Sequence, residues 1–230
     1  MTIRNPFKTL SRMEKMLWGA SGLIISASFL LCGTKDLLTL TASLIGVTAL
    51  IFVAKGQVIG QLLTVVFAVF YGVISCWFRY YGEMITYLGM TSPIAILAVI
   101  EWLRHPFQDS AEVAVSRVTL RQTVVMLLLT ALTTAGFYFI LRALNTANLM
   151  LSTVSVATSF LASYLTYLRS PYYAVGYAAN DLVLIGLWSL AFLQDPSCLP
   201  MIVCFAMFFL NDAYGFVNWQ RMQRRQEQFA

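Results

Sequence analysis

Two Asn-Asp pairs, Asn180-Asp181 and Asn211-Asp212, interrupt long apolar stretches of this 230-residue chain. Each pair offers amide donors and acceptors beside a carboxyl group that can carry a negative charge. An unpaired carboxylate in the middle of a bilayer costs on the order of 3 kcal/mol even on insertion scales, so such residues mark ligand sites, pathways or helix partners. The pattern favours recognition of a small polar molecule, with Asp181 or Asp212 available to balance a positive charge.

Aromatic and amide side chains accompany both pairs. Tyr177 precedes Asp181 by four positions and Trp188 follows it by seven, which groups the three on one side of a helix. The second pair leads into Tyr214 and Asn218. An aromatic face can stack on a cationic ring, an interaction worth up to about 2 kcal/mol when water is excluded. We predict that these residues contribute to one binding site.

A polar stripe marks a third apolar stretch. Gln57, Gln61, Thr64 and Tyr71 fall at offsets of 0, 4, 7 and 14, so they share one helical face. That face must be buried, because lipid cannot satisfy its hydrogen-bonding groups. We predict that it faces the two Asn-Asp helices across a closed central cavity.

A structural interpretation of the same residues stays open. Amide and carboxyl groups can join helices through hydrogen bonds worth about 0.6 kcal/mol each, and Gly56, Gly60 and Gly72 allow helices to approach closely. Many of the aromatic residues must serve packing or the membrane-interface belts. The residue types alone do not decide between a binding site and helix contacts.

The elements that hold these residues follow from composition and hydropathy. Hydrophobic residues make up 59% of the chain and charged residues 11%, against about 25% charged in a soluble domain. Apolar runs long enough for a membrane-crossing helix recur throughout, and they do not alternate as the strands of a barrel would. The expected fold class is an all-α polytopic membrane protein with eight transmembrane helices. The predicted spans are 17–32, 37–54, 58–78, 84–103, 123–141, 149–168, 173–193 and 199–219.

The basic residues predict the orientation of these helices. All but three of the fifteen Lys and Arg residues fall on one side of the predicted membrane, the exceptions being Lys35, Arg79 and Arg142. Cytoplasmic loops carry such an excess, so both termini are expected in the cytoplasm. The net charge of +5 therefore reflects topology, and the absence of a continuous basic stripe argues against a nucleic-acid partner.

Catalytic and metal-binding signatures are absent from the sequence. It contains no HExxH, GxSxG or phosphate-binding P-loop motif, and its one histidine, His105, lies in a polar connection, 104–122. The four cysteines show no CxxC spacing. We therefore expect neither an enzyme nor a bound metal or cofactor.

The two halves of the chain resemble each other. A shift of 117 positions places Tyr71 on Trp188 and Trp102 on Trp219. The repeat unit has an even number of spans, so both copies would share one orientation about an axis along the membrane normal. We interpret this pattern as a parallel internal repeat that is split by the 104–122 connection.

The run from Asn211 to Trp219 (NDAYGFVNW) is similar to the closing helix of the PnuC nicotinamide riboside transporters. The segment from Asn180 to Trp188 and the Gln57-to-Tyr71 stripe fit the same family, and the resemblance covers essentially the whole chain. It implies a SWEET-like core of two three-helix bundles joined by a linker helix, with an extra N-terminal helix. The implied segments are a cytoplasmic 1–16, the extra helix 17–33, a first bundle 37–103, the cytoplasmic connection 104–122, the linker 123–141, a second bundle 149–219 and a cytoplasmic tail 220–230.

The resemblance also implies a function. It points to uptake of nicotinamide riboside across a bacterial inner membrane by facilitated diffusion, with phosphorylation trapping the product, and to a homotrimer. The riboside joins a cationic pyridinium ring, a carboxamide and ribose hydroxyls, which suits aromatic stacking and the amides described above. The alternatives are another B vitamin, such as thiamine or riboflavin, or a substrate-binding subunit that needs an energising partner. The expected substrate-binding residues are Gln57, Gln61, Thr64, Tyr71, Tyr177, Asn180, Asp181, Trp188, Asn211, Asp212, Tyr214 and Asn218.

Overall fold

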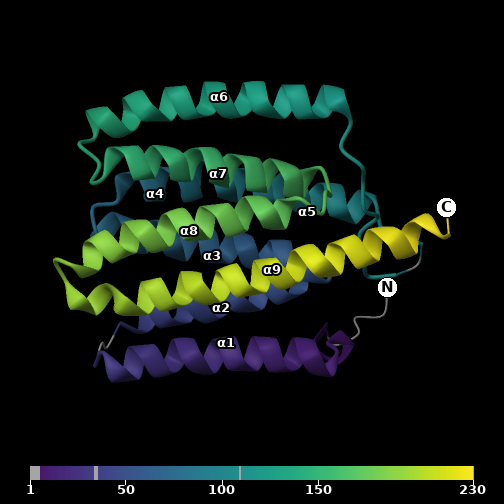
Figure 1. Ribbon diagram of the computed structural model, residues 1–230, viewed down its shortest axis with the longest axis horizontal. Helices are drawn as coiled ribbons and strands as arrows, with labels where there is room; N and C mark the ends of the chain where they lie inside the picture. Colours follow the sequence, from purple (N-terminus) through teal and green to yellow (C-terminus); the bar gives the residue numbers. More distant parts are fainter. Residues whose placement is uncertain (1–5, 34–35, 109, 230) are drawn as a thin grey trace.

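The computed structural model describes residues 6–33, 36–108 and 110–229, and its regular elements are helices (Figure 1). Lys35, one of the basic residues used for orientation, lies outside the described residues. The α-helices are α1 (Arg12–Leu31), α2 (Leu37–Ala54), α3 (Val58–Trp77), α4 (Tyr81–Thr86), α5 (Ser92–Arg104), α6 (Leu120–Ala143), α7 (Leu149–Tyr167), α8 (Tyr173–Phe192) and α9 (Leu199–Glu227). A π-helical turn, η2 (Tyr87–Thr91), joins α4 to α5, and 3-10 turns η1 (Pro6–Thr9) and η3 (Pro196–Cys198) precede α1 and α9.

Seven segments of the described chain are long and apolar enough to cross a membrane. They are α2, α3, the continuous α4–η2–α5 segment, α6, α7, α8 and the segment 196–227 that contains α9. The first of the eight predicted spans forms the helix α1, but it is not among the seven, and its first turn carries Arg12, Glu14 and Lys15. The structure therefore establishes an all-helical protein with seven candidate spans.

The ends of two helices differ from the predicted spans. The fourth span was expected to begin at Met84, but α4 begins at Tyr81 and brings Glu83 into the bundle. The last helix was expected to end at Trp219, and it continues to Glu227. Its extra turns are polar and carry Arg224 and Arg225. The helix therefore continues past the hydrocarbon region, whereas hydropathy detects only the apolar part of it.

Local sequence explains where several helices start. Ser11 accepts a hydrogen bond from the backbone nitrogen of Glu14 while the Glu14 carboxylate accepts one from Ser11, which forms a capping box at α1. Thr119 and Gln122 form the same arrangement at α6. Asp36 caps α2 by accepting from the backbone nitrogen of Thr39 at 3.0 Å. These caps satisfy backbone donors that the first helical turn leaves free.

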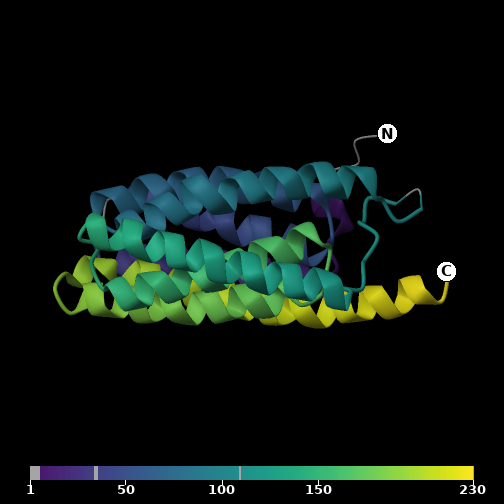
Figure 2. The same ribbon diagram turned by 90° about the horizontal axis from the view of Figure 1, so that it is seen from above.

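The helices lie side by side along one long axis (Figures 1 and 2). Their contacts form a closed ring that runs from α2 to α3, α5, α7, α8, α9 and back to α2. Helix α1 packs outside this ring on α2 and α9, and α6 packs outside it on α7, at the opposite edge of the bundle. The ring is the part of the fold that can hold a site.

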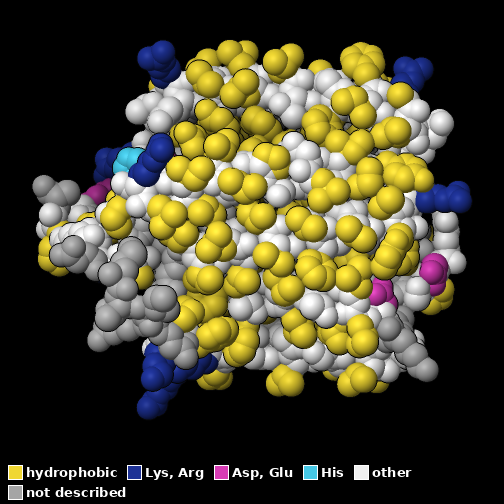
Figure 3. Space-filling view, turned by 180° about the vertical axis from the view of Figure 1, so that it is seen from behind, with side chains coloured by type: hydrophobic (Ala, Val, Ile, Leu, Met, Phe, Trp, Pro, Cys, Tyr) yellow, Lys and Arg dark blue, Asp and Glu magenta, His cyan; other side chains and the backbone are white. Residues whose placement is uncertain are grey.

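The outer surface suits a lipid environment. Hydrophobic side chains cover the middle of the molecule, while Lys and Arg side chains gather toward its two ends (Figure 3). On the peripheral helix α6, Leu128, Leu132 and Phe139 are 65–72% exposed, which water would disfavour and hydrocarbon would not. The positions of these residues support membrane insertion of the bundle.

The polar connection between α5 and α6 closes one end of the ring. Val113 donates from its backbone nitrogen to the Gly56 carbonyl at 2.9 Å, and Gln226 of α9 bonds to the backbone of both Val113 and Val115. Arg169, in the turn between α7 and α8, donates to the Ala114 carbonyl at 3.2 Å. The connection thus ties α2, α7 and α9 together at the end where α1 begins and α9 ends (Figure 1).

Candidate functional site

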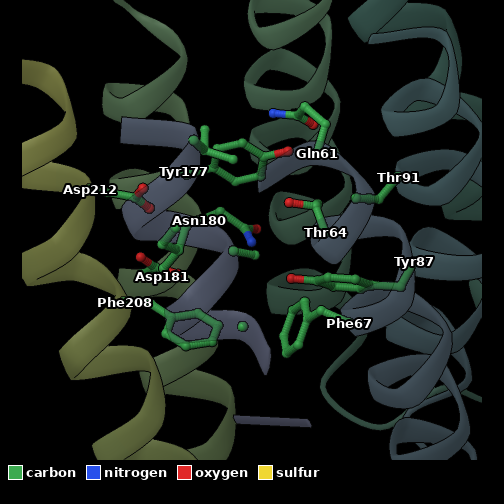
Figure 4. Close-up of a pocket in the computed structure, with 14 residues that line it drawn as sticks. Gln61, Thr64, Phe67, Tyr87, Thr91, Tyr177, Asn180, Asp181, Phe208 and Asp212 are labelled. Atoms are coloured by element: carbon green, nitrogen blue, oxygen red, sulfur yellow. The ribbon is translucent and has the colours of Figure 1, made fainter. Parts of the chain in front are cut away.

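A cavity lies inside the ring, between α2, α3, η2, α8 and α9. Its walls combine polar groups with aromatic rings, of which Phe67, Tyr87 and Phe208 form one end of the cavity (Figure 4). Of the twelve predicted binding residues, the structure places the following around this cavity: Gln61, Thr64, Tyr177, Asn180, Asp181 and Asp212.

The cavity is small, with a volume of about 40 Å³. Each enclosed water molecule needs about 10–15 Å³ of such space, whereas binding pockets for small organic ligands have about 300 Å³ or more. A vitamin-sized ligand can therefore enter only if the lining side chains and helices move apart.

Asp181 of α8 and Asp212 of α9 face each other across the cavity wall (Figure 4). Their side chains lie within hydrogen-bonding reach of each other, and the residues are only 4% and 3% exposed. Neither carboxyl forms an ion pair with a Lys, Arg or His among the described residues, and Asp181 Oδ2 has no hydrogen-bond partner there. Two buried carboxyls without a basic partner form a strong attraction for a cation.

The orientation of the Asn180 side chain is set by α7. Its Oδ1 accepts hydrogen bonds from Ser155 at 3.2 Å, Thr158 at 2.9 Å and Ser159 at 3.0 Å. Three hydroxyl donors identify the oxygen and leave Nδ2 without a partner among the described residues. Asn180 therefore presents an amide donor beside the acceptor oxygens of Asp181.

Helix α3 contributes the opposite wall. Gln61 is 2% exposed, and its amide makes no hydrogen bond to another described residue. Thr64, one turn further along α3, donates a hydrogen bond from its hydroxyl to the Gly60 carbonyl at 3.0 Å. Gln61 is thus the group on α3 that remains able to donate and accept toward a ligand.

Tyr71 and Trp188 lie one layer beyond the aromatic end of the cavity. Trp188 Nε1 donates to Tyr71 Oη at 3.0 Å, and both residues are fully buried. The Trp188 ring meets Phe78 at 5.1 Å and Tyr80 at 5.3 Å, while Tyr71 meets Tyr87 at 4.4 Å between ring centroids. The two predicted stacking residues therefore belong to an aromatic layer behind the cavity rather than to its lining.

Asn211 and Tyr214 face α1 rather than the cavity. Asn211 donates to Ser21 Oγ at 3.0 Å, and Tyr214 donates to the Glu14 carboxylate at 2.9 Å. Lys55 forms an ion pair with Glu14 at 3.1 Å. Adjacent residues on a helix point about 100° apart, so Asp212 can line the cavity while its neighbour Asn211 holds the outer helix.

Gln57 and Asn218 lie at the end of the ring that the polar connection covers. Gln57 donates to Thr9 Oγ1 at 3.0 Å, and Asn218 donates to the Ala54 carbonyl at 2.8 Å. The neighbouring Trp219 donates to the Val53 carbonyl at 2.8 Å. Asn218 and Trp219 thus satisfy carbonyls at the end of α2, Gln57 joins the start of α3 to η1, and none of the three lines the cavity.

Comparison with known proteins identifies the relatives of this chain. A family model described as nicotinamide mononucleotide transporter matches residues 36–221. The chain belongs to this family. The family resemblance read from the sequence is thereby confirmed, as is an all-helical membrane fold, and the family is one of transporters rather than enzymes.

Two curated relatives and one solved structure support this membership. The chain is 25% identical to the nicotinamide riboside transporter PnuC of Neisseria mucosa over 214 residues, which cover 91% of this chain and 81% of the relative. It is 22% identical to the PnuC of Haemophilus influenzae over 190 residues, which cover 82% and 81%. The crystal structure of a vitamin B3 transporter PnuC superposes with a TM-score of 0.82 at 24% identity and covers 94% of each chain. That similarity concerns the fold.

Sequence reasoning missed Glu83, which is fully buried on α4. Its Oε2 accepts a hydrogen bond from Ser155 at 3.2 Å, and Oε1 has no partner among the described residues. Ser155 also contacts Asn180, so Glu83 lies one side chain away from the cavity wall. The sequence did show Glu83 as a lone carboxyl beside an apolar run, but the predicted span began at the next residue, Met84.

Proposed function

We propose that this chain carries nicotinamide riboside across the bacterial inner membrane and that the cavity inside the ring is its substrate site. The observation that carries the proposal is the Asp181–Asp212 pair, which is buried in the membrane without a basic partner among the described residues. A pyridinium ring can pair with a negative charge on one of these carboxyls. The substrate named for the Neisseria and Haemophilus relatives has that chemistry.

The remaining groups of the cavity suit the other parts of this ligand. The free amide of Asn180 and the amide of Gln61 match a carboxamide or ribose hydroxyls. Phe67, Tyr87 and Phe208 provide aromatic surface beside the charge. We propose that Tyr71 and Trp188 contribute by supporting Phe67 and Tyr87 from behind, because Tyr71 packs on both rings and Trp188 is bonded to Tyr71.

We further propose that transport is facilitated diffusion and that phosphorylation of the product in the cytoplasm keeps it inside. Purified protein in liposomes should equilibrate radiolabelled riboside and stop when the two concentrations are equal. Accumulation should then require a riboside kinase and ATP enclosed in the vesicles. Accumulation without the kinase would contradict this part, and a requirement for a second subunit would favour the energised-partner alternative.

The proposed architecture is a SWEET-like arrangement with α1 as an eighth, additional crossing. In it α2, α3 and α4–α5 form the first bundle, α6 is the linker, and α7, α8 and α9 form the second bundle. The ring of contacts and the peripheral positions of α1 and α6 support this division. Both termini would be cytoplasmic, and we expect a homotrimer in detergent. Alkaline phosphatase fused after Ala230 should be inactive, and activity there would exclude the topology.

Direct binding tests the substrate. Calorimetric titration of the purified protein should detect nicotinamide riboside and should detect thiamine or riboflavin only weakly. Nicotinic acid riboside carries an added carboxylate and should bind worse, because it meets Asp181 and Asp212 unfavourably. Preferred binding of thiamine or riboflavin would reassign the transporter to that vitamin.

A further inference from the structure

Asp181 and Asp212 are close enough to share a proton. The structure brings their carboxyl groups within hydrogen-bonding reach, and both groups line the same cavity (Figure 4). Asp181 is 96% buried, and its Oδ2 has no hydrogen-bond partner among the described residues. Two carboxylates at this separation cannot both stay ionised in a low-dielectric site.

The groups around the pair supply no positive charge. The titratable neighbours are Tyr87 of η2, Tyr173 and Tyr177 of α8, Cys204 of α9 and, one side chain further away, the carboxyl of Glu83 on α4. From α2 the cavity receives only apolar residues, and from α3 it receives the neutral Gln61, Thr64 and Phe67. Within the described chain, no Lys, Arg or His forms an ion pair with either carboxyl. A net negative charge on the pair would therefore be uncompensated.

Without a cation, the least costly state of such a pair is neutral. Each carboxyl then keeps its proton, and one O–H donates to an oxygen of the other. A bound pyridinium changes the balance, because its single positive charge is best matched by one negative charge. The same two carboxyls can provide that charge if one of them ionises.

We propose that binding of the cationic riboside to this cavity releases one proton from the Asp181–Asp212 pair. The O–H bond of one carboxyl breaks, its electron pair stays on the oxygen, and the proton passes to water. The other carboxyl keeps its proton and donates to the new carboxylate. The pair is neutral before binding, and the pair plus its ligand is neutral afterwards. This inference rests on the proposed function, since it requires a cationic substrate.

Calorimetry of nicotinamide riboside binding tests the proposal directly. The binding enthalpy, measured at one pH in phosphate and in Tris, should differ by the amount expected for about one proton released per riboside bound. While the free pair holds two protons and the bound pair holds one, the dissociation constant should fall about tenfold for each unit of rising pH, and this range includes the pH of the buffer comparison. The sign follows because a reaction that releases a proton is favoured when protons are scarce. The uncharged, reduced dihydropyridine form of the riboside should bind without releasing a proton.

Variants identify the source of the proton. Asp181→Asn combined with Asp212→Asn removes both ionisable groups and should abolish proton release, flatten the pH profile, and weaken binding of the cationic form about tenfold or more. Asp195→Asn changes an exposed carboxyl outside the ring and should leave proton release unchanged. Binding of the reduced riboside shows whether the double variant is folded. If the double variant does not fold, the buffer comparison and the pH dependence of the wild-type protein decide whether a proton is released.

The failures of the two proposals are distinguishable. Nicotinamide riboside that binds with the same enthalpy in both buffers and with an affinity independent of pH would overturn proton release and leave the proposed function intact. Proton release that persists in the folded double variant would also overturn it. Absence of riboside binding at every pH would overturn the proposed function itself.

Discussion

Trp188 Nε1 donates a hydrogen bond of 3.0 Å to Tyr71 Oη, and the two residues are 117 positions apart in the sequence. Trp102 and Trp219 have the same separation in sequence, and their ring centroids lie 5.5 Å apart toward the other end of the bundle. Residues related by a two-fold axis touch each other only where they lie beside that axis. The two contacts therefore support a parallel repeat whose axis runs along the helices.

The contact between Tyr71 and Trp188 predicts how Trp188 contributes. Trp188→Phe keeps an aromatic ring against Phe78 and Tyr80 but loses the hydrogen bond, so we expect a loss of about 1 kcal/mol of stability. Affinity for the riboside should change less than about threefold. Trp188→Ala also leaves a cavity and should cost about 3–5 kcal/mol of stability. Thermal unfolding and calorimetric titration of the same samples measure both effects. Loss of affinity in Trp188→Phe with unchanged stability would instead place the indole against the substrate.

Gln57, the N-cap residue of α3, and Gln61, one turn inside it, form a matched pair for testing the site. Gln61 lines the cavity, whereas Gln57 donates to Thr9 outside it. Gln61→Ala should weaken riboside binding by about 1–2 kcal/mol, because one or two hydrogen bonds to the ligand are lost. Gln57→Ala should change affinity by less than about 0.5 kcal/mol. Calorimetric titration of both variants measures these losses. A larger loss in Gln57→Ala than in Gln61→Ala would place the binding site at the end of the ring that the polar connection covers.

A glycine at the α7–α8 contact predicts a packing effect. A Cβ on Gly176 would lie 2.8 Å from Ala162 Cα, so Gly176→Ala must push the two helices apart. We expect a cost of about 1–3 kcal/mol, seen as a lower unfolding temperature in detergent. Gly186, on the same helix, has nothing within 4 Å of the added Cβ. Gly186→Ala should therefore be neutral or slightly stabilising, since Ala has the higher helix propensity, and equal losses in both variants would show that the Ala162 contact is not responsible.

The buried Glu83 predicts a difference between two substitutions. No Lys, Arg or His pairs with it among the described residues, so its carboxyl is expected to stay neutral. Glu83→Gln keeps its shape and hydrogen-bonding capacity and should cost less than about 1 kcal/mol. Glu83→Ala removes one of the two acceptors of Ser155 and leaves a cavity, so we expect a loss of about 2–4 kcal/mol of stability. Chemical or thermal unfolding compares them. A Gln variant as unstable as the Ala variant would show that a negative charge is required there.

The sequence by itself determined the class of protein and the positions of most helices. In a membrane every backbone group must be satisfied within the helix, so the length and polarity of an apolar run are enough to locate it. The same rule made the polar stripe and the Asn-Asp pairs conspicuous. Six of the residues chosen on that basis, from Gln61 to Asp212, surround one cavity.

Only the tertiary structure decided which side of each helix faces the cavity. Asp212 lines it and Asn211 binds α1, although the two are adjacent in sequence. Gln57 binds Thr9 of η1 although Gln61, one turn away, lines the cavity, and Glu83 lies inside the bundle because η2 carries α4 continuously into α5. Helix rotation depends on contacts with every neighbour at once. A hydropathy pattern records that a residue must be buried, but it does not record against which partner.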